Sequence, residues 1–418
     1  MTEQSKTVAV RQTGPLSGIR ILDLTSMISG PMTTLMLADQ GADVVKIENP
    51  KGGDHTRAVS TARGSFSASF VNNNRNKSSL TLNLKDPRAV SIFLDLSRDA
   101  DVVVQNFRPG VADRIGVGYE AVRAVAPHIV YASISGFGDT GPYAQKPVYD
   151  PLVQALSGLT TVQGGSDEAR PRLVRTIVPD KLTGYACSQA ICAALFHRER
   201  NGGRSAEGQH IKLSMLDTVV SFLWGSDMGN HTFVGDEKDA ETAQSFIDLI
   251  YETADGYISV AVQSNKEWEG LTRAFGKPEW LTDPRFASSA LRGKNIDERL
   301  ALTQEVLLTD TADNWLSRLE AEDVPCAPVL TRREVVRHPQ IVANETVVEI
   351  DHPQAGVLRQ ARPAPRFSQS PASFRKPAPA LGADSQRILS HLGLDDREIE
   401  ELSAEGVTSF GPNEESVS

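Results

Sequence analysis

The sequence is poor in cysteine, with 3 such residues among 418. Three thiols cannot build a disulfide framework, and Cys187, Cys192 and Cys326 form no C-x-x-C pair of the type that binds metal. Cys187 and Cys192 lie in an apolar stretch with helical periodicity, where we expect buried thiols. The sequence therefore excludes the disulfide-stapled secreted class and fits a reducing compartment.

Long apolar runs and an excess of positive charge are also missing. No stretch reaches the roughly 18 to 20 apolar residues of a membrane-spanning helix, and the first residues, MTEQSKTVAVRQTGPLSG, lack the apolar core of a signal peptide. The chain carries 43 Lys and Arg against 53 Asp and Glu, a net charge of -10. This balance argues against a nucleic-acid or membrane partner but allows a local basic pocket for one polyanionic ligand. We expect a cytoplasmic enzyme.

The signature motifs of several enzyme classes are absent from the sequence. There is no G-x-S-x-G and no H-E-x-x-H, and the eight histidines are scattered, so we expect neither serine-hydrolase chemistry nor a metal site. The turn after the first predicted strand contains only Gly30, so the G-x-G-x-x-G fingerprint of nicotinamide binding is missing. Glu48 still lies where a dinucleotide fold carries its acidic residue.

Strand-like and helix-like segments alternate over the first third of the chain. The apolar run 19–25 leads into a helix opened by Ser29-Gly30-Pro31 and stopped at Gly41, and a second apolar run, 42–48, completes one βαβ unit. The alternation predicts a mostly parallel sheet with helices on both faces. The remaining elements predicted for this sheet are strands 79–84, 101–106 and 128–137 and helices 87–100 and 119–127.

The pattern then changes. Residues 181–200 predict an amphipathic helix, followed by strand 210–216 and a helix that begins at Asp217. The polar stretch 228–245 indicates a linker, and residues 246–335 predict a smaller α+β domain. Its expected elements are strand 257–262, helix 265–276, helix 311–323 and strand 326–330.

Residues 352–382 are rich in proline, serine and arginine and have no periodicity. A run of this length without secondary structure is unusual inside a compact domain, so we expect an extended arm over a surface or a partner chain. Two further helices are predicted, at 384–393 and 396–406.

Several segments contain candidate functional residues, each with an alternative structural role. Asp180 precedes a long helix, where its carboxylate could cap the helix or act as a nucleophile held as the anion, and the two roles are compatible. The amides of Ser29-Gly30-Pro31 could bind a phosphate, and the glycine-rich tracts 136–142 and 158–165 could bind an oxyanion or form surface turns. Cations near the predicted strand ends could surround a polyphosphate or be solvated surface: Lys51, Arg57, Arg75, Lys77, Lys85, Arg108, Arg114 and Lys146.

The order of several long segments resembles the class III CoA-transferases, the family of formyl-CoA:oxalate and carnitine CoA-transferases. The segments include GIRILDLTSMISGPMTTLMLADQGADVVKIENPKGGDHTR, ADVVVQNFRPGVADRIGVGYE and VPDKLTGYACSQAICAALFHRERNGG, and the closing LSHLGLDDREIEEL also fits. The similarity extends from about residue 15 to 410.

The resemblance implies a two-domain α/β protomer. A Rossmann-like large domain would comprise residues 15–227 and, after the linker 228–245 and the small domain 246–335, a return arm and C-terminal part at 336–410. Two ring-like chains would interlock into a homodimer, and the proline-rich arm would provide the reach that this threading requires.

The resemblance also implies a mechanism. Asp180 would attack the donor thioester to give a mixed anhydride, which the CoA thiolate would convert to an aspartyl-CoA thioester. The acceptor carboxylate would then react, and CoA would pass to the new acid. An acyl-CoA and a carboxylic acid are the expected partners, the CoA thioester is a substrate, and no permanently bound cofactor is expected.

The family's CoA contacts can be transferred only by position. Asn49 and Ile28 replace an Arg and a Gln seen in some members, and a small-domain run of glycines found in the formyl-CoA enzyme is missing, which argues against oxalate as the acceptor. Met27, Tyr149 and Trp224, with Ile28, indicate a partly apolar pocket for a medium-length acid. The implied CoA and substrate contacts are Ile28, Ser29, Leu82, Asn83, Leu84, Lys85, Asn106, Phe107, Arg108, Arg114 and Lys146.

Other acyl-CoA activities share this scaffold. Racemases of 2-methylacyl-CoA use a His/Asp pair, and Tyr149 lies here where their His would lie, directly before Asp150. Asp150 is either a helper at the site or a structural residue. A racemase or isomerase, a thioesterase, and a non-catalytic acyl-CoA-binding protein are the alternatives to the transferase.

Overall fold

The computed structural model describes residues 14–235 and 249–411. Contacts divide the chain into a large unit, Met1–Thr242 with Glu345–Ser418, and a small unit, Ala243–Asn344. The small unit thus runs beyond the boundary expected at 335 and includes α14 (Arg332–Val335) and α15 (Pro339–Ala343). The linker expected at 228–245 falls mainly outside the described residues.

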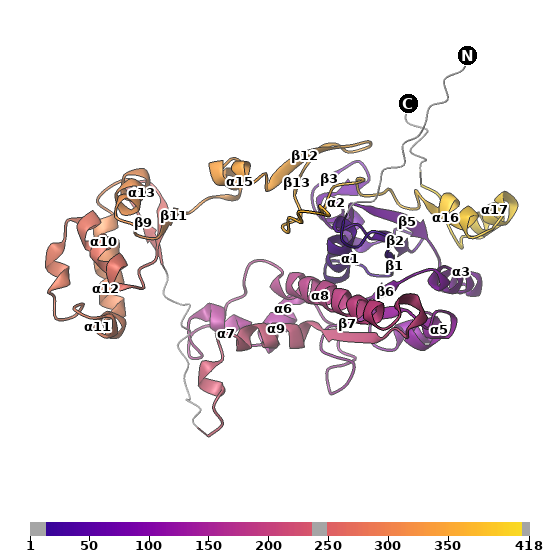
Figure 1. Ribbon diagram of the computed structural model, residues 1–418, viewed down its shortest axis with the longest axis horizontal. Coiled ribbons are helices and arrows are strands. Elements are labelled where there is room, and N and C mark those ends of the chain that lie inside the picture. The colour runs from indigo at the N-terminus through magenta and orange to yellow at the C-terminus, as the bar shows by residue number, and fades with distance from the viewer. Residues whose placement is uncertain (1–13, 236–248, 412–418) are drawn as a thin grey trace, which may run out of the picture. The chain divides into compact units, whose positions relative to one another are not determined.

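Among the described residues, six parallel strands form the sheet of the large unit (Figure 1). The strand order turns back beside β1, whose two neighbours are β2 and β6, and ligands of such sheets bind where the order reverses. The predicted parallel sheet is confirmed. In spatial order the strands are β5 (Lys77–Thr81), β2 (Asp43–Glu48), β1 (Arg20–Asp23), β6 (Val102–Gln105), β7 (Val130–Ser135) and β8 (His210–Ser214).

Helices cover both faces of the sheet, as predicted. One face packs on α1 (Ser29–Asp39) and α8 (Val178–Arg200), with Cys187 fully buried between α8 and the strands. The other face packs on helices from the middle and the end of the chain. These are α3 (Pro87–Arg98), α5 (Tyr119–Val125), α16 (Ser385–His391) and α17 (Asp396–Ala404).

The strand predicted at 79–84 starts two residues earlier and ends three residues earlier, at Lys77–Thr81. Its first residues are Lys77, Ser78 and Ser79, which are polar but buried. Their polarity hides the strand from an analysis based on apolar runs, because each side chain is paired with a partner inside the protein.

The arm expected at 352–382 is only partly irregular. Its first third contains β13 (Gly356–Ala361), which forms an antiparallel hairpin with the preceding β12 (Val347–His352), so the prediction of an unstructured run is wrong there. Arg63 and Gln360 tie this hairpin to the start of the chain through hydrogen bonds to backbone carbonyls. It packs on β3 (Ala62–Arg63), β4 (Phe66–Ser67) and α2 (Ala68–Asn74).

The rest of the arm covers the outer edge of β5. The amide of Asn76 donates to the Lys376 carbonyl at 3.0 Å, and the amide of Asp384 donates to the Ser79 carbonyl at 3.0 Å. Thr81 completes the edge, because its amide donates to Ser385 Oγ at 3.1 Å. The outer edge is therefore bonded at Asn76, Ser79 and Thr81, which blocks part of a template for pairing with another chain.

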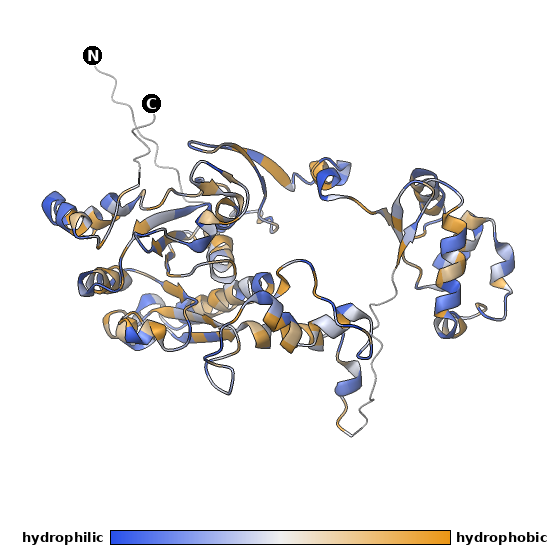
Figure 2. Cartoon of the chain, turned by 180° about the vertical axis from the view of Figure 1, so that it is seen from behind, coloured by the Kyte–Doolittle hydropathy of each residue, from blue (hydrophilic) through white to orange (hydrophobic). Residues whose placement is uncertain are grey.

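The small unit has its own core. Trp268 and Trp280 stack with ring centroids 5.9 Å apart, and Trp315 is buried beside them. The hydrophilic and hydrophobic stripes of its helices agree with one buried face for each (Figure 2). Its antiparallel sheet contains β9 (Ile250–Glu252), β10 (Tyr257–Val260) and β11 (Cys326–Pro328), and its main helices are α10 (Asn265–Phe275), α11 (Ser289–Lys294), α12 (Ile296–Leu307) and α13 (Ala312–Ala321).

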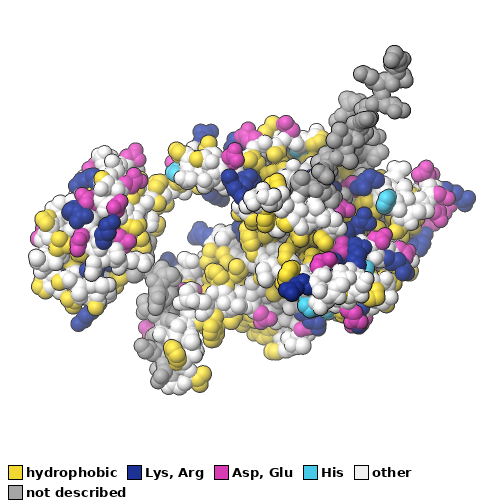
Figure 3. Space-filling view, in the orientation of Figure 1, with side chains coloured by type: hydrophobic (Ala, Val, Ile, Leu, Met, Phe, Trp, Pro, Cys, Tyr) yellow, Lys and Arg dark blue, Asp and Glu magenta, His cyan; other side chains and the backbone are white. Residues whose placement is uncertain are grey.

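A layer of helices near β8 completes the large unit. It leaves large apolar side chains exposed, and hydrophobic side chains gather over α8 and α9 in the space-filling view (Figure 3). The helices of this layer are α6 (Asp150–Leu156), α7 (Leu159–Gly164) and α9 (Met215–Trp224). A short helix, α4 (Val111–Arg114), lies with α5 on the opposite side of the sheet. The exposed apolar residues of this layer and of the adjoining α8 are Leu152, Leu156, Tyr185, Phe196, Phe222 and Trp224.

Candidate active site

Two cavities meet at the carboxyl ends of β1 and β6, where the strand order reverses. The first, called here the Asp180 cavity, has a volume of about 250 Å³ and is lined by Asp180 and by loops after β1, β6 and β7. The second, the Leu82 cavity, has a volume of about 310 Å³ and is lined by residues after β2 and β5. Ser26 and Phe107 line both cavities, so a single extended ligand can occupy the two.

The loops after β1 and β6 are fixed to each other by one asparagine. The Ser26 amide donates to Asn106 Oδ1 at 3.0 Å, and Asn106 Nδ2 donates back to the Ser26 carbonyl at 2.8 Å. The next residue, Met27, has a backbone φ of 69°, a value that residues other than glycine rarely adopt. Asp54 Oδ1 accepts the Met27 amide at 3.1 Å and holds this strained turn at the floor of the site.

A fully buried ion network lies beneath this turn. Lys46 Nζ contacts Asp54 at 2.9 Å and donates to the Thr25 carbonyl at 2.7 Å, and Lys77 Nζ lies 3.1 Å from Asp23. Burial lowers the pKa of Lys77 to about 8. Burial alone would raise the pKa of Asp23, but Lys77 and Lys46 hold it well below its usual range.

Three of the cations considered for a polyphosphate are therefore occupied. Lys77 pairs with Asp23, Arg57 with Glu48 at 2.7 Å, and Arg75 with Asp39 at 2.7 Å. Glu48 thus serves an internal ion pair. Sequence spacing cannot distinguish such cations from free ones, because their carboxylate partners lie far away in the chain. Lys51, Lys85, Arg108, Arg114 and Lys146 are exposed.

Asp180 is the third residue of α8, and the residue before the helix is Ile177. The prediction that Asp180 caps the helix is wrong, because the carboxylate that reaches its backbone comes from elsewhere. The Asp180 amide donates to Asp150 Oδ2 at 3.2 Å, and Gln154 Nε2 donates to Asp150 Oδ1 at 2.6 Å. Asp150 begins α6 and is buried, so two helix starts meet at the cavity.

The side chain of Asp180 is left to face the start of α1. Burial raises the pKa of Asp180 to about 6, and the neighbouring Asp150 charge acts in the same direction. Hydrogen bonds from the Ser29 amide and hydroxyl lower it. The Ser29 amide, considered for phosphate binding, is therefore directed to a carboxylate of the chain itself. Burial also raises the pKa of Asp150.

A glycine brings α1 and α8 close enough for this contact. A Cβ at Gly184 would lie 3.2 Å from the Ser29 carbonyl oxygen and 3.2 Å from Met32 Cβ. Gly184 is one turn after Asp180, so its missing side chain sets the distance between the two helix starts.

Most of the residues implied by the resemblance lie in these cavities. Ile28, the residue before α1, and Arg114 on α4 lie outside both linings, as does Trp224. The Asp180 cavity is lined by Ser29, Asn106, Phe107, Arg108, Lys146, Tyr149 and Asp150. The Leu82 cavity is lined by Leu82, Asn83, Leu84 and Lys85, with Phe107 shared.

Sequence reasoning missed several residues of the site. Ser26, Ile134 and Met215 line the Asp180 cavity, and Asp54 holds the turn that forms its floor. They belong to no local motif, and they share only a position at or beyond the carboxyl end of a strand. The tract 136–142 contributes Gly136 and Phe137 to the Asp180 cavity, whereas no residue of 158–165 lines either cavity.

The chain is similar to known proteins over most of its length. The family model for CoA-transferase family III matches residues 16–385. The chain is 34% identical over 401 residues to the human succinyl-CoA:glutarate CoA-transferase, covering 94% of this chain and 90% of the relative. It is 33% identical over 415 residues to the formyl-CoA:oxalate CoA-transferase of Streptomyces coelicolor, covering 94% and 98%.

This chain belongs to CoA-transferase family III. A solved structure of a CAIB/BAIF family protein from Brucella suis superposes with a TM-score of 0.79 at 29% identity, covering 91% of this chain and 100% of that one. The fold expected from the resemblance, an α/β protomer of this family, is confirmed. CoA-transferases act on CoA thioesters, which are polyanionic. The net charge of the chain, although negative, is compatible with one such substrate.

Within 14–235 and 249–411, no cluster of His, Cys, Asp and Glu side chains could hold a metal ion. No helix in the same ranges has the length and apolar character needed to span a membrane.

Proposed function

We propose that this CoA-transferase moves CoA from an acyl-CoA to a free carboxylic acid with Asp180 as the covalent nucleophile. The Asp180 carboxylate attacks the thioester carbonyl and forms a mixed anhydride as the CoA thiolate leaves. The thiolate then attacks the aspartyl carbonyl, releases the donor acid as its carboxylate and leaves an aspartyl-CoA thioester. The acceptor carboxylate repeats the two steps in reverse, so the new acyl-CoA leaves and Asp180 is regenerated.

The observation that carries this proposal is the setting of the Asp180 carboxylate. It is half-buried in a cavity that continues into the Leu82 cavity, and the Ser29 amide and hydroxyl orient it. A pKa of about 6 leaves it ionised at neutral pH yet more basic than an ordinary aspartate. These properties suit a nucleophile that must attack and also leave.

The two cavities divide the CoA thioester between them. We place the nucleotide end in the Leu82 cavity, against Leu82–Lys85, and the thioester end beside Asp180, with the Asn106–Arg108 segment between them. Lys85, in the lining of the Leu82 cavity, is an exposed cation available to the phosphates. Ile28 and Arg114 stay proposed contacts from the resemblance alone.

The acid is a dicarboxylic acid longer than oxalate. Relatives at similar identity are named for succinyl-CoA with glutarate and for formyl-CoA with oxalate. Met27 and Tyr149 add apolar surface to the Asp180 cavity, which suits a longer carbon chain, and Arg108 and Lys146 in the same lining can pair with a second carboxylate.

The active protein is a homodimer. Tyr185, Phe196 and Phe222 are each more than half exposed in the helical layer around α8, and apolar surface of this kind is usually covered in the assembled protein. Light scattering after gel filtration tests the stoichiometry, and a monomer at micromolar concentration would contradict it. The cytoplasmic location stays a prediction from the sequence.

Mass spectrometry tests the activity and the nucleophile together. The protein is mixed with acetyl-CoA, succinyl-CoA and glutaryl-CoA and with ¹⁸O-carboxylate-labelled succinate and glutarate. We expect a labelled acyl-CoA and, because the anhydride leaves one acid oxygen on the enzyme, an ¹⁸O atom in the peptide that contains Asp180. Asp180→Asn should lose more than about a thousandfold in activity.

The matched control is Asp313→Asn, an exposed carboxylate in the first turn of α13, which should keep full activity. Label in the acyl-CoA without label in the Asp180 peptide would contradict the covalent route. Exchange of an α-proton without an acceptor acid would instead indicate a racemase, and release of free acid alone would indicate a thioesterase.

A further inference from the structure

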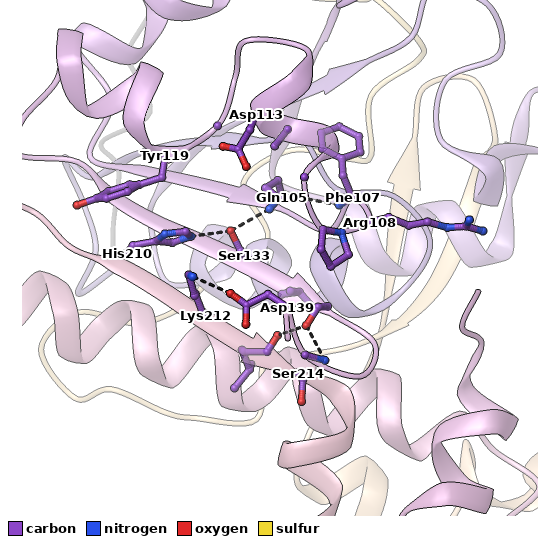
Figure 4. Close-up of a pocket in the computed structure, with 18 of the residues that line it drawn as sticks. Gln105, Phe107, Arg108, Asp113, Tyr119, Ser133, Asp139, His210, Lys212 and Ser214 are labelled. Atoms are coloured by element: carbon purple, nitrogen blue, oxygen red, sulfur yellow. Dashed lines mark hydrogen bonds and ion pairs between the residues drawn. The ribbon is translucent and has the colours of Figure 1, made fainter. Parts of the chain in front are cut away.

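A third cavity, of about 330 Å³, lies over β6, β7 and β8 on the face of the sheet that carries α4 and α5. It is called here the Gln105 cavity. Phe107 and Arg108, seen in Figure 4 at one side of this cavity, also line the Asp180 cavity, so the loop after β6 lies between the two. The Gln105 cavity contains no residue of the proposed mechanism other than this loop.

A line of hydrogen bonds crosses the floor of the Gln105 cavity and ends on that loop. The Phe107 amide donates to Gln105 Oε1 at 2.7 Å, and Gln105 Nε2 donates to Ser133 Oγ at 2.8 Å. Ser133 Oγ lies 2.8 Å from His210 Nε2 (Figure 4). The register of the sheet brings these side chains together. Gln105 is opposite Ser133 on β7, and His210 on β8 is opposite Tyr131, two residues before Ser133 and on the same face.

The Gln105 amide hydrogen occupies one lone pair of Ser133 Oγ. The serine then bonds His210 Nε2 in either neutral tautomer: its hydroxyl donates to a bare Nε2, or its second lone pair accepts from an Nε2–H. In both cases Ser133 stays the acceptor of the Gln105 amide. The ring is held between Tyr119, stacked at 4.6 Å, and Tyr131, edge-on at 5.3 Å, and burial lowers its pKa. The line thus fixes the orientation of the Gln105 amide.

Gln105 is the last residue of β6, and its side chain turns back to the backbone two residues later. It fixes Phe107 from one side while Asn106 holds Ser26 from the other. The loop between the two cavities is therefore anchored by two side chains of opposite direction, one on each face.

We propose that Gln105 is a positioning residue for CoA, which acts through the Phe107 amide and is itself oriented by Ser133 and His210. This inference rests on the proposed function, in which the Asn106–Arg108 segment contacts the CoA thioester. Gln105 touches neither the reacting atoms nor Asp180. Its loss therefore affects the binding of the CoA donor more than the chemical step.

Kinetics of three variants test the proposal. Gln105→Met has nearly the same length and removes both hydrogen bonds, and one lost hydrogen bond of this kind corresponds to about a 3- to 10-fold change. We expect the KM for the acyl-CoA donor to rise by about that factor, with kcat and the KM for the acceptor acid within about twofold. Gln105→Glu keeps an acceptor for the Phe107 amide and should restore at least half of the loss.

Ser133→Ala removes the orienting partner. Because both residues act along one line, the double variant Gln105→Met with Ser133→Ala should raise the donor KM by less than the product of the single effects. The matched control is Gln386→Met on the exposed side of α16, which should leave the donor KM unchanged. The proposal would be overturned if Gln105→Met lowered kcat and raised both KM values by similar factors, or if Gln105→Glu restored none of the loss.

Calorimetric titration with free CoA separates this inference from the proposed function. Wild type and Asp180→Asn should bind CoA equally, and Gln105→Met should bind it about 3- to 10-fold more weakly. If wild type binds no CoA, the proposed function fails. If wild type and Gln105→Met bind CoA with the same affinity, the positioning role alone fails.

Discussion

The substitution Asp150→Asn tests how the cavity controls the ionisation of the nucleophile. Burial and the Asp150 charge together raise the pKa of Asp180 from 3.8 to about 6, and each pKa unit corresponds to about 1.4 kcal/mol between the two protonation states. The reactive form is the anion, so activity falls as pH falls through that value. At pH 5 only about one tenth of the enzyme would carry ionised Asp180.

The variant removes the like charge and keeps an oxygen for the Asp180 amide. The pKa of Asp180 should fall, and the acidic limb of the rate profile should move to lower pH by about 0.5 to 1 unit. Donor kcat/KM at pH 5 should then be about 2.5- to 5.5-fold higher than in wild type. The variant should also be less stable, because its amide faces that of Gln154. Above pH 7 the variant gains nothing, since Asp180 is ionised in both proteins.

The assay is donor kcat/KM from pH 4.5 to 8 at constant ionic strength. This parameter reports groups of the free enzyme and of the free donor, and the 3′-phosphate of CoA also titrates near pH 6. The donor is common to both proteins, so the difference between the profiles isolates Asp180. Superimposed profiles would show that the Asp150 charge does not affect the pKa of Asp180. If the acidic limb of the wild-type profile lies below pH 5, the raised pKa of Asp180 is itself refuted.

Two further predictions concern the scaffold of the site. Lys77→Met leaves Asp23 buried without its partner and should lower the free energy of unfolding in urea by about 3 to 5 kcal/mol, and adding Asp23→Asn should recover most of this, unlike two independent losses. Gly184→Val places methyl groups against the Ser29 carbonyl and should separate α8 from α1, so kcat should fall well below that of Gly184→Ala; equal rates for the two variants would show that this spacing does not position Asp180.

The sequence predicts the architecture of the large unit well, because apolar runs and helical periodicity are local properties. One exception is the hairpin of β12 and β13, which lacks a local apolar pattern. Another is β5, whose Lys77, Ser78 and Ser79 look like surface residues but are buried with distant partners. Asp384 and Lys376, which reach this strand, lie about three hundred positions later in the chain. No local pattern contains such a pairing.

The candidate site divides in the same way. Asp180 is conspicuous in the sequence because it starts a long helix, yet its contact with Asp150 depends on how α6 and α8 pack. Asp54 shows no local pattern at all, although it holds the one strained residue of the turn, Met27. Contacts between segments, more than residue types, decide which of the candidate cations remain free.

The covering of β5 also has a consequence for synthesis on the ribosome. The groups that cap its edge are made last, and the bond between Ser79 and Gly382 spans 303 residues. At about 5 to 20 residues per second, a nascent chain would expose this edge for roughly 15 to 60 s before its cover emerges. A truncated chain that ends before residue 376 would leave this edge uncovered permanently. Such fragments should aggregate or require a chaperone, even though all six strands of the sheet are present.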